Sequence, residues 1–207
     1  MLEKLEREVR NPRLRALVLE RVEEFKLNNR ADEDVWFREL ALCVLTANSS
    51  FVSAYRVLGH VMEEFDKGTL NFERVLKDHG YRLYDVKARY LRGIVKYRGR
   101  LKKWIKPIAD VNQKRAREVL ADEIYGIGMK EASHFLRNVG YFDLAIVDKH
   151  VSRFVTASGL VSPFKSLTKR KYLEIEAKLT ELARRYGMAV GVLDLFIWHV
   201  ETGTVLK

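Results

Sequence analysis

The sequence contains few of the residues that cross-link a fold or form tight turns. Its 207 residues include one cysteine, Cys43, three prolines and twelve glycines. A single cysteine excludes an intramolecular disulfide, a zinc site built from cysteines and an iron–sulfur cluster. So few prolines and glycines permit long helices and argue against β folds that are dense in turns.

Long apolar runs are missing as well. The most apolar stretch near the end, residues 188–198, is interrupted by Asp194 and is too short to span a bilayer. Residues 1–6 are charged and lack the apolar core of a secretion signal. We therefore expect no membrane association and a cytoplasmic location, and the single cysteine agrees with a reducing compartment.

Acidic residues are outnumbered by basic ones. The chain has 38 lysines and arginines against 28 aspartates and glutamates, which gives a formal net charge of +10. Hydrophobic residues make up 47% of the chain, which is typical of a globular protein with a core. The positive excess indicates a polyanionic partner. Nucleic acid is favoured over an anionic membrane surface, because no single basic segment is strongly amphipathic.

Apolar residues recur at helical spacing along most of the chain. Residues 35–45 and residues 172–186 each place them at steps of three and four, with charged residues on the other face of the second stretch. No stretch alternates strictly between polar and apolar residues, as a half-buried strand would. Pro107 and the polar residues 110–113 indicate a break. The sequence predicts an all-α protein of roughly ten helices joined by short turns.

A short glycine motif lies between two helical patterns, where residues 125–130 read Tyr-Gly-Ile-Gly-Met-Lys. Gly126 and Gly128, separated by one apolar residue, predict a tight turn between two helices in which Ile127 points inward. The second helix then begins with free backbone N–H groups, which suit a phosphate. A generic connection between helices is the alternative for so short a motif.

Lys130 and Asp148 extend this motif. Lys130 stands two residues after the second glycine, and Asp148 follows eighteen positions later (148 − 130). The interval fits one short helix, a turn at residues 139–140 and a returning segment, so the carboxylate can come back beside the amine. Taken singly, Lys130 is a surface lysine and Asp148 a helix N-cap. Together with the hairpin they form one recognisable constellation.

The hairpin, the eighteen-residue interval and the block Val-Asp-Lys-His-Val at residues 147–151 resemble the helix–hairpin–helix DNA glycosylase superfamily. Residues 45–50, Leu-Thr-Ala-Asn-Ser-Ser, are similar to the segment that fills the gap left by a flipped base. Residues 84–88, Tyr-Asp-Val-Lys-Ala, resemble another helix start of the superfamily. One departure is Ile124-Tyr125, where the superfamily usually has Leu-Pro.

Within the superfamily, the chain differs from endonuclease III because it lacks the four cysteines of that enzyme's cluster. Its compact length and C-terminal residues 196–207 resemble the archaeal-type 8-oxoguanine DNA glycosylase/AP lyases, the second 8-oxoguanine glycosylase family. The resemblance implies a bifunctional base-excision repair enzyme that flips out and removes 8-oxoguanine. The enzyme would then nick the abasic site by β-elimination through a lysine Schiff base.

Two alternatives to this function remain. The same fold could act on another lesion, for example an oxidised pyrimidine, because the Lys130 and Asp148 pair does not distinguish between bases. The chain could also be a non-catalytic helix–hairpin–helix DNA-binding module, in which both residues have structural roles only.

The resemblance also implies roles for single residues. Lys130 is expected to attack C1′ of the deoxyribose, and Asp148 to stabilise the cationic sugar, orient the lysine or move protons. Backbone N–H groups at Gly126 and Gly128, together with His150, would bind phosphates. His150 could equally be a polar residue of a first helical turn. Asn48 would fill the gap left by the base, and a helix-end cap is its alternative role.

The base pocket is expected near the C-terminus. Trp198 and the terminal carboxylate of Lys207 belong to it by resemblance, because these glycosylases close on 8-oxoguanine with a C-terminal carboxylate and aromatic stacking. Tyr84 and Asp194 are further candidates for reading the lesion. A role in the core or as a cap is the alternative for Tyr84, Asp194 and Trp198.

Basic and aromatic residues interleave between residues 84 and 106, where nine lysines and arginines occur from Lys87 to Lys106. This pattern predicts either a DNA-facing surface or a solvated helix face whose aromatic residues belong to the core.

The resemblance implies two helical lobes with a DNA-binding cleft between them. Residues 31–141 would form a central lobe that ends in the helix–hairpin–helix, and residues 1–30 with 142–207 the second lobe. We expect no required cofactor and no metal cluster, because Cys43 and the histidines show no zinc spacing. The superfamily implies only a monovalent cation at the hairpin backbone. The expected partner is damaged DNA, bound by a monomer associated with the nucleoid.

Overall fold

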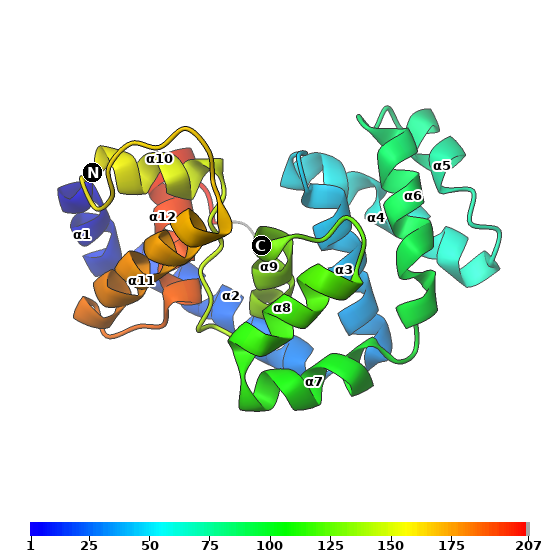
Figure 1. Cartoon of the computed structure of the whole chain (residues 1–207), viewed down its shortest axis with the longest axis horizontal. Coiled ribbons are helices and arrows are strands. Elements are labelled where there is room, and N and C mark those ends of the chain that lie inside the picture. The colour runs from blue at the N-terminus through cyan, green and yellow to red at the C-terminus, as the bar shows by residue number, and fades with distance from the viewer. Residues whose placement is uncertain (206–207) are drawn as a thin grey trace. The chain divides into compact units, whose positions relative to one another are not determined.

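The computed structural model describes residues 1–205, and the regular elements in that range are all helices (Figure 1). Twelve α-helices and one short 3-10 helix follow one another, and no strand occurs among these residues. The all-α class predicted from the periodicity is confirmed. None of the described helices is both long and apolar enough to cross a bilayer.

The chain forms two compact units, one of residues 1–27 with residues from 140 onward, the other of residues 28–139. The first unit contains most of α2 (Pro12–Arg30), together with α1 (Leu2–Arg10), α10 (Lys149–Ala157), α11 (Lys169–Arg185) and α12 (Val190–Thr202). The second contains α3 (Glu33–Thr46), α4 (Phe51–Lys67), α5 (Phe72–Asp78), α6 (Tyr84–Ile94), η1 (Val95–Tyr97), α7 (Leu101–Val111), α8 (Gln113–Glu123) and α9 (Met129–Asn138).

The α3 helix forms the centre of the second unit, where it contacts α4, α6, α7 and α9 (Figure 1). Asp32 is its N-cap and accepts a hydrogen bond from the backbone N–H three residues later, at 3.1 Å. The rings of Trp36 and Phe37 are fully buried and meet Phe135 and Phe65 edge to face, with centroid distances of 5.8 and 4.8 Å. Because α3 is buried along most of its length, its C-terminal end is held from several sides.

The break predicted from Pro107 and residues 110–113 is found in the polar stretch and not at the proline, because α7 continues through Pro107 to Val111. Pro107 and Lys103 are both exposed, so water can bind the Lys103 carbonyl that lacks a helical N–H partner. The chain breaks instead at Asn112, within the polar stretch. Its side chain accepts a hydrogen bond from the N–H of Arg115 at 3.0 Å and so caps α8.

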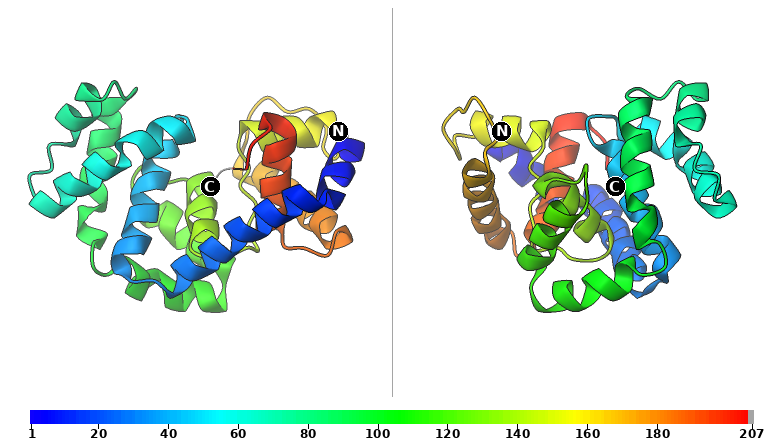
Figure 2. Two further views of the ribbon diagram at one scale, coloured as in Figure 1. Left: turned by 180° about the vertical axis from the view of Figure 1, so that it is seen from behind. Right: turned by 45° about the vertical axis from the view of Figure 1, so that its right-hand side comes forward.

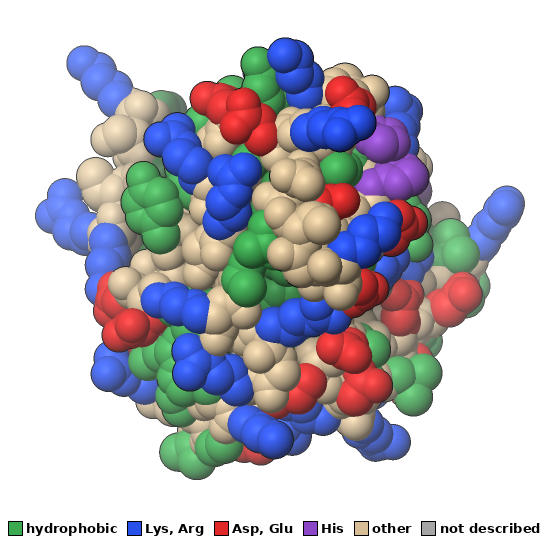
Figure 3. Space-filling view, turned by 90° about the vertical axis from the view of Figure 1, so that its right-hand side faces the viewer, with side chains coloured by type: hydrophobic (Ala, Val, Ile, Leu, Met, Phe, Trp, Pro, Cys, Tyr) green, Lys and Arg blue, Asp and Glu red, His purple; other side chains and the backbone are tan. Residues whose placement is uncertain are grey.

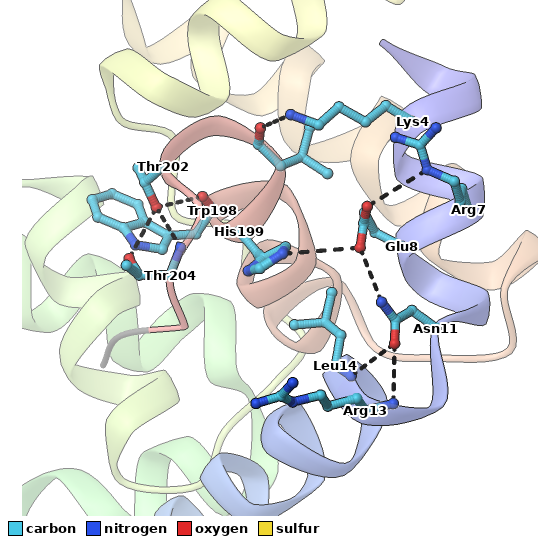
Figure 4. A network of polar contacts seen from close by, with 11 residues as sticks. Lys4, Arg7, Glu8, Asn11, Arg13, Leu14, Trp198, His199, Thr202 and Thr204 are labelled. Atoms are coloured by element: carbon cyan, nitrogen blue, oxygen red, sulfur yellow. Dashed lines mark hydrogen bonds and ion pairs between the residues drawn. The ribbon is translucent and has the colours of Figure 1, made fainter.

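In the first unit, helices from the two ends of the chain lie side by side. The α1 helix packs against α12 (Figure 2). Lys4 Nζ donates a hydrogen bond to the carbonyl of Val200 at 2.6 Å, and Nε2 of His199 lies 3.9 Å from Oε2 of Glu8 (Figure 4). These contacts fix the C-terminal helix against the N-terminal one.

The apolar stripe predicted for residues 172–186 faces the core of the first unit. Tyr172, Ile175, Leu179 and Leu182 of α11 are all buried. The helix ends at Arg185, just before Gly187, whose backbone has the left-handed φ of +67°.

Candidate active site

The glycine motif forms a tight turn between α8 and α9. Ile127 is buried at this turn, and its N–H donates to the carbonyl of Ile124 at 3.0 Å. Gly126 has a φ of +89°, and a Cβ there would lie 2.5 Å from the ring of Tyr90. The close neighbour is therefore an aromatic ring. Gly128, with extended backbone, has no comparable steric need.

The α9 helix begins at Met129 after Gly128, its N-cap, which supplies no side-chain hydrogen bond. The first backbone N–H groups of a helix have no partner within the helix, so those of α9 are suited to an external acceptor. Tyr125, just before the turn, is 74% exposed and meets Tyr90 edge to face, with centroids 5.2 Å apart. The turn therefore offers backbone donors and one exposed aromatic ring.

Lys130 is the second residue of α9, and its side chain is 24% exposed. The carboxylate of Glu131 lies beside it, with Oε1 3.6 Å from the Lys130 Nζ. Lys130 belongs to the second unit and Asp148 to the first, so the pairing of these two residues stays a prediction. Glu131 was not predicted as a site residue, although its place next to Lys130 in the sequence indicates that its carboxylate can lie near the amine.

Asp148 is the N-cap of α10. Its Oδ1 accepts hydrogen bonds from the N–H groups of His150 at 2.9 Å and Val151 at 2.8 Å. Its other oxygen, Oδ2, makes no hydrogen bond to residues 1–205, and the residue is half-buried. The capping role proposed as the alternative is therefore present in the structure. It leaves one carboxylate oxygen for other work.

The segment before Asp148 is held by side chains of α11. The hydroxyl of Tyr172 donates to the carbonyl of Ala145 at 2.6 Å and accepts from the N–H of Val147 at 3.3 Å. Glu176 accepts a hydrogen bond from the N–H of Ala145 at 2.9 Å. These bonds satisfy a buried backbone that forms no regular element, and so they fix where Asp148 begins α10.

His150 and Trp198 are brought together by α10 and α12. Their rings meet at 66° with centroids 4.8 Å apart. The indole Nε1 of Trp198 is buried and has no hydrogen-bond partner within the described residues. Thr202 donates a hydrogen bond to the Trp198 carbonyl at 2.8 Å (Figure 4), and Arg153 Nε donates to Glu201 at 2.6 Å, which joins α10 to α12. This corner of the first unit therefore brings a buried indole N–H without a described partner close to an imidazole.

Asp194 and Tyr84 are the other pocket candidates within the described residues. Asp194 is buried in α12. Tyr84 is the first residue of α6, in the second unit, with Lys77 Nζ 5.8 Å from its ring centroid. Lys207 lies outside the described residues. Of the three pocket candidates that the structure describes, Trp198 alone is half-exposed in the same unit as His150.

Asn48 lies in the turn between α3 and α4 and is exposed. The caps at this turn are Ala47, at the end of α3, and Ser50, which accepts a hydrogen bond from the N–H of Ser53 at 3.1 Å. Asn48 follows the C-cap of α3 directly, where a residue with left-handed backbone commonly ends a helix, so its alternative role at a helix end stays a prediction. Its backbone has a positive φ of 56°, which asparagine tolerates better than most residues.

The basic stretch from residue 84 to 106 is not one uniform surface. Lys87 is buried, with 2% of its surface exposed, and Nζ of Lys106 bonds to Asp110 at 2.9 Å. The face drawn in Figure 3 carries lysines and arginines interspersed with acidic side chains. Only part of this stretch is therefore available to a polyanion.

No group of three or more potential metal ligands occurs among residues 1–205. Cys43 is fully buried, and burial, with a further contribution from the Glu39 carboxylate, raises the pKa of its thiol far above the usual range. A thiol that stays protonated is a poor nucleophile, so Cys43 is no candidate for the chemistry of this site.

Comparison with known proteins gives one consistent result. The family model described as 8-oxoguanine DNA glycosylase matches residues 18–188. The chain is 51% identical over 202 residues to the 8-oxoguanine DNA glycosylase/AP lyase of Sulfolobus acidocaldarius, covering 96% of this chain and 98% of that protein. It is also 51% identical over 203 residues to the protein of the same name from Saccharolobus solfataricus, with the same coverage.

Solved structures agree with this result. The Methanocaldococcus jannaschii 8-oxoguanine glycosylase/lyase, in complex with a 15mer DNA containing 8-oxoguanine, aligns with a TM-score of 0.87 and 35% identity. The alignment covers 99% of this chain and 98% of that one. The 8-oxoguanine DNA glycosylase of Thermotoga maritima aligns with a TM-score of 0.88 and 37% identity, over 100% of this chain and 98% of that one.

Proposed function

Because the chain belongs to the 8-oxoguanine DNA glycosylase family, we propose that it removes 8-oxoguanine from DNA and then nicks the abasic site. The observation that carries this proposal is the identity with glycosylase/AP lyases over nearly the whole of both chains. The net charge of +10 agrees with a DNA substrate. The function is that of a bifunctional base-excision repair enzyme.

Lys130 is the proposed nucleophile. Its neutral amine attacks C1′ while the bond from C1′ to the base breaks, and the base leaves after taking up a proton. Opening of the sugar ring gives a Schiff base between Lys130 and C1′. Loss of a proton from C2′ then expels the 3′ phosphate, and water releases the lysine. The partly exposed side chain at the start of α9, beside the hairpin, supports this assignment.

Asp148 is the proposed electrostatic partner in base release. The sugar becomes positively charged as the base departs, and a carboxylate stabilises such a charge. Oδ1 is used by the cap of α10, which supports Oδ2 as the oxygen that faces the sugar, orients Lys130 or moves a proton.

The DNA backbone is proposed to bind at the hairpin and at the start of α10. Backbone N–H groups at Gly126, Gly128 and Lys130 are donors of the kind that phosphates accept, and the exposed turn supports this role. His150 would add a phosphate contact. Asn48, exposed in the turn after α3, would fill the gap left by the flipped base.

The base pocket is proposed to include Trp198, whose buried indole Nε1 lacks a partner within residues 1–205. Lys207 remains in this proposal through its terminal carboxylate, which could accept the Watson–Crick donors of a guanine. Tyr84 and Asp194 remain as further candidates. Recognition of the lesion itself must use the N7–H donor or the O8 acceptor, because these distinguish 8-oxoguanine from guanine.

We further propose that the protein acts as a monomer on nucleoid DNA in the cytoplasm, with residues 31–141 and residues 1–30 plus 142–207 as its two lobes. We expect this chemistry to need no cofactor. A monovalent cation bound to backbone carbonyls of the hairpin would add positive charge beside a phosphate. Carbonyl oxygens are suitable ligands for such an ion.

Borohydride trapping tests this function. Wild-type protein and the Lys130→Gln variant are incubated with duplexes that contain 8-oxoguanine, an oxidised pyrimidine or an abasic site, and covalent protein–DNA adducts are counted. We expect wild type to trap on 8-oxoguanine and abasic duplexes. Lys130→Gln should trap on none of them yet still bind DNA in a gel-shift assay.

Other results would favour the alternatives. Trapping on the oxidised pyrimidine but not on 8-oxoguanine would change the substrate while keeping the mechanism. DNA binding without trapping by wild type would reduce the protein to a non-catalytic DNA-binding module. Full base release by Lys130→Gln would remove this lysine from the reaction.

A further inference from the structure

Two buried side chains hold the C-terminal end of α3. Nζ of Lys87 donates a hydrogen bond to the carbonyl of Val44 at 2.7 Å, and the hydroxyl of Tyr81 donates to the carbonyl of Leu45. The last carbonyls of a helix lack N–H partners within that helix, so they need donors from elsewhere. Here both donors come from one short segment, residues 81–87.

The same segment also holds the turn that follows α3. Nη2 of Arg82 donates to the carbonyl of Asn48 at 2.8 Å. Three donors, from Tyr81, Arg82 and Lys87, therefore bind carbonyls within a span of five residues, 44–48. The position of the Asn48 side chain depends on them.

Lys87 is the unusual member of this set, because it is only 2% exposed. Burial lowers its pKa from 10.5 to about 8, while the Glu131 carboxylate raises the pKa and the Lys130 cation lowers it further. A hydroxyl such as that of Tyr81 makes the same kind of bond without the cost of burying an ammonium group. Capping alone therefore does not explain a lysine at this position.

The ammonium group of Lys87 also faces the hairpin. It lies 5.6 Å from the ring centroid of Tyr90, one turn further along α6, within the range of a cation–π interaction. The Tyr90 ring fills the space that a Cβ at Gly126 would need and meets Tyr125 edge to face. Lys87 thus contacts the end of α3 directly and supports the hairpin through a single ring.

We propose that Lys87 is a positioning residue that couples the Asn48 turn to the hairpin before Lys130. The residue that fills the gap and the nucleophile are thereby held in a fixed relation within the second unit. This inference rests on the proposed function, because it assigns Lys87 a role in the reaction of Lys130. Lys87 itself is too buried to touch DNA.

A double-mutant cycle tests the coupling. Lys87→Met keeps the apolar stem and removes the donor and the charge, and Asn48→Ala removes the side chain of the turn. Single-turnover base excision is measured for wild type, both single variants and the double variant. We expect Lys87→Met to slow excision by about tenfold or more, the size of effect found within contact networks. The double variant should be slower than the slower single variant by no more than about twofold.

The lyase reaction tests the connection to the hairpin. Lys87→Met should also slow borohydride trapping at a preformed abasic site, because Lys130 follows the hairpin that Tyr90 supports. Trp36→Phe is the matched control, since it removes a part-buried hydrogen bond from the N-terminal end of α3 to the Asn28 carbonyl of α2. We expect its thermal stability to fall while its excision rate stays near that of wild type.

Several results would overturn the proposal. One is a double variant whose excision rate falls by the product of the two single losses, which would mean that Lys87 and Asn48 act independently. Another is trapping by Lys87→Met at the wild-type rate. A third is a loss of excision rate in Trp36→Phe as large as that in Lys87→Met. If Lys87→Met does not fold, Lys87→Gln takes its place in the cycle, and failure of both to fold would make Lys87 purely structural. Absence of trapping by wild type would instead refute the proposed function.

Discussion

The carboxylate of Asp148 accepts a hydrogen bond from the backbone N–H of His150, 2.9 Å from its Oδ1. The same oxygen also accepts from the N–H of Val151. A residue proposed to act on the sugar is therefore also the cap that begins α10. Capping uses Oδ1 and the proposed role on the sugar would use Oδ2, so substitutions can separate the two roles.

Asp148→Asn should separate charge from capping. Asparagine caps a helix about as well as aspartate, so thermal stability should stay close to that of wild type. Loss of the negative charge should slow single-turnover base release by about 100-fold or more, the range seen when electrostatic stabilisation of a transition state is lost. Asp148→Ala should show the same kinetic defect and lose about 1 kcal/mol of unfolding free energy as well. A wild-type rate in Asp148→Asn would leave this residue as a cap only.

The two hairpin glycines should respond differently to a methyl group. Gly126→Ala must place a Cβ 2.5 Å from the Tyr90 ring at a φ of +89°, so we expect it to lose about 3 kcal/mol of unfolding free energy. Gly128→Ala meets only Glu131, at 3.5 Å, with extended backbone, and should change stability by less than about 1 kcal/mol. Urea unfolding of both variants measures this contrast. Equal losses of unfolding free energy in the two variants would mean that the Tyr90 ring moves aside at little cost.

Local patterns in the sequence were sufficient to predict the helical class and several details. The three-to-four spacing of apolar residues in 172–186 corresponds to the buried face of α11. A helix repeats every 3.6 residues, so this face can be predicted from the local sequence without knowing its contacts with distant segments. Ile127 is buried between its two glycines, as the short turn required. Asp148 caps a helix as aspartate before an apolar pattern commonly does.

Contacts between distant segments could not be predicted in this way. Lys87 was grouped with a basic surface, yet its partner Val44 is 43 residues away and draws it into the core. The Tyr90 ring explains why position 126 must be glycine, and no local pattern indicates that contact. Pro107 was interpreted as a break because the sequence does not show which helix face is exposed to water.

Shortening the chain should affect recognition of the base more than chemistry at the sugar. If the terminal carboxylate accepts the donors of 8-oxoguanine, deletion of Lys207 or a C-terminal tag should slow excision of 8-oxoguanine by about tenfold. Trapping at an abasic duplex, which offers no base to recognise, should change much less. Single-turnover assays on the two substrates measure the difference. Equal effects on both would remove the chain end from the pocket.

The buried ammonium of Lys87 should give a specific dependence of stability on pH. Below about pH 8 the folded and unfolded states both carry this proton, and the folded state bears the cost of a buried charge. Between about pH 8 and 10.5 the folded state has released the proton while the unfolded lysine keeps it. The unfolded state then binds more protons, so the free energy of unfolding rises with pH.

Lys87→Met lacks this titration, so the unfolding free energy of wild type relative to the variant should rise by up to about 3 kcal/mol from pH 8 to pH 10. Urea unfolding at several pH values measures this difference. Tyr81, whose pKa is raised by burial, lowers stability at the highest pH in both proteins and so cancels. Lys114→Met, which replaces an exposed lysine in the same unit, is the control and should follow wild type. Since the rise requires a pKa that is lower in the folded than in the unfolded state, a difference that stays constant with pH would mean that burial does not lower the pKa of Lys87.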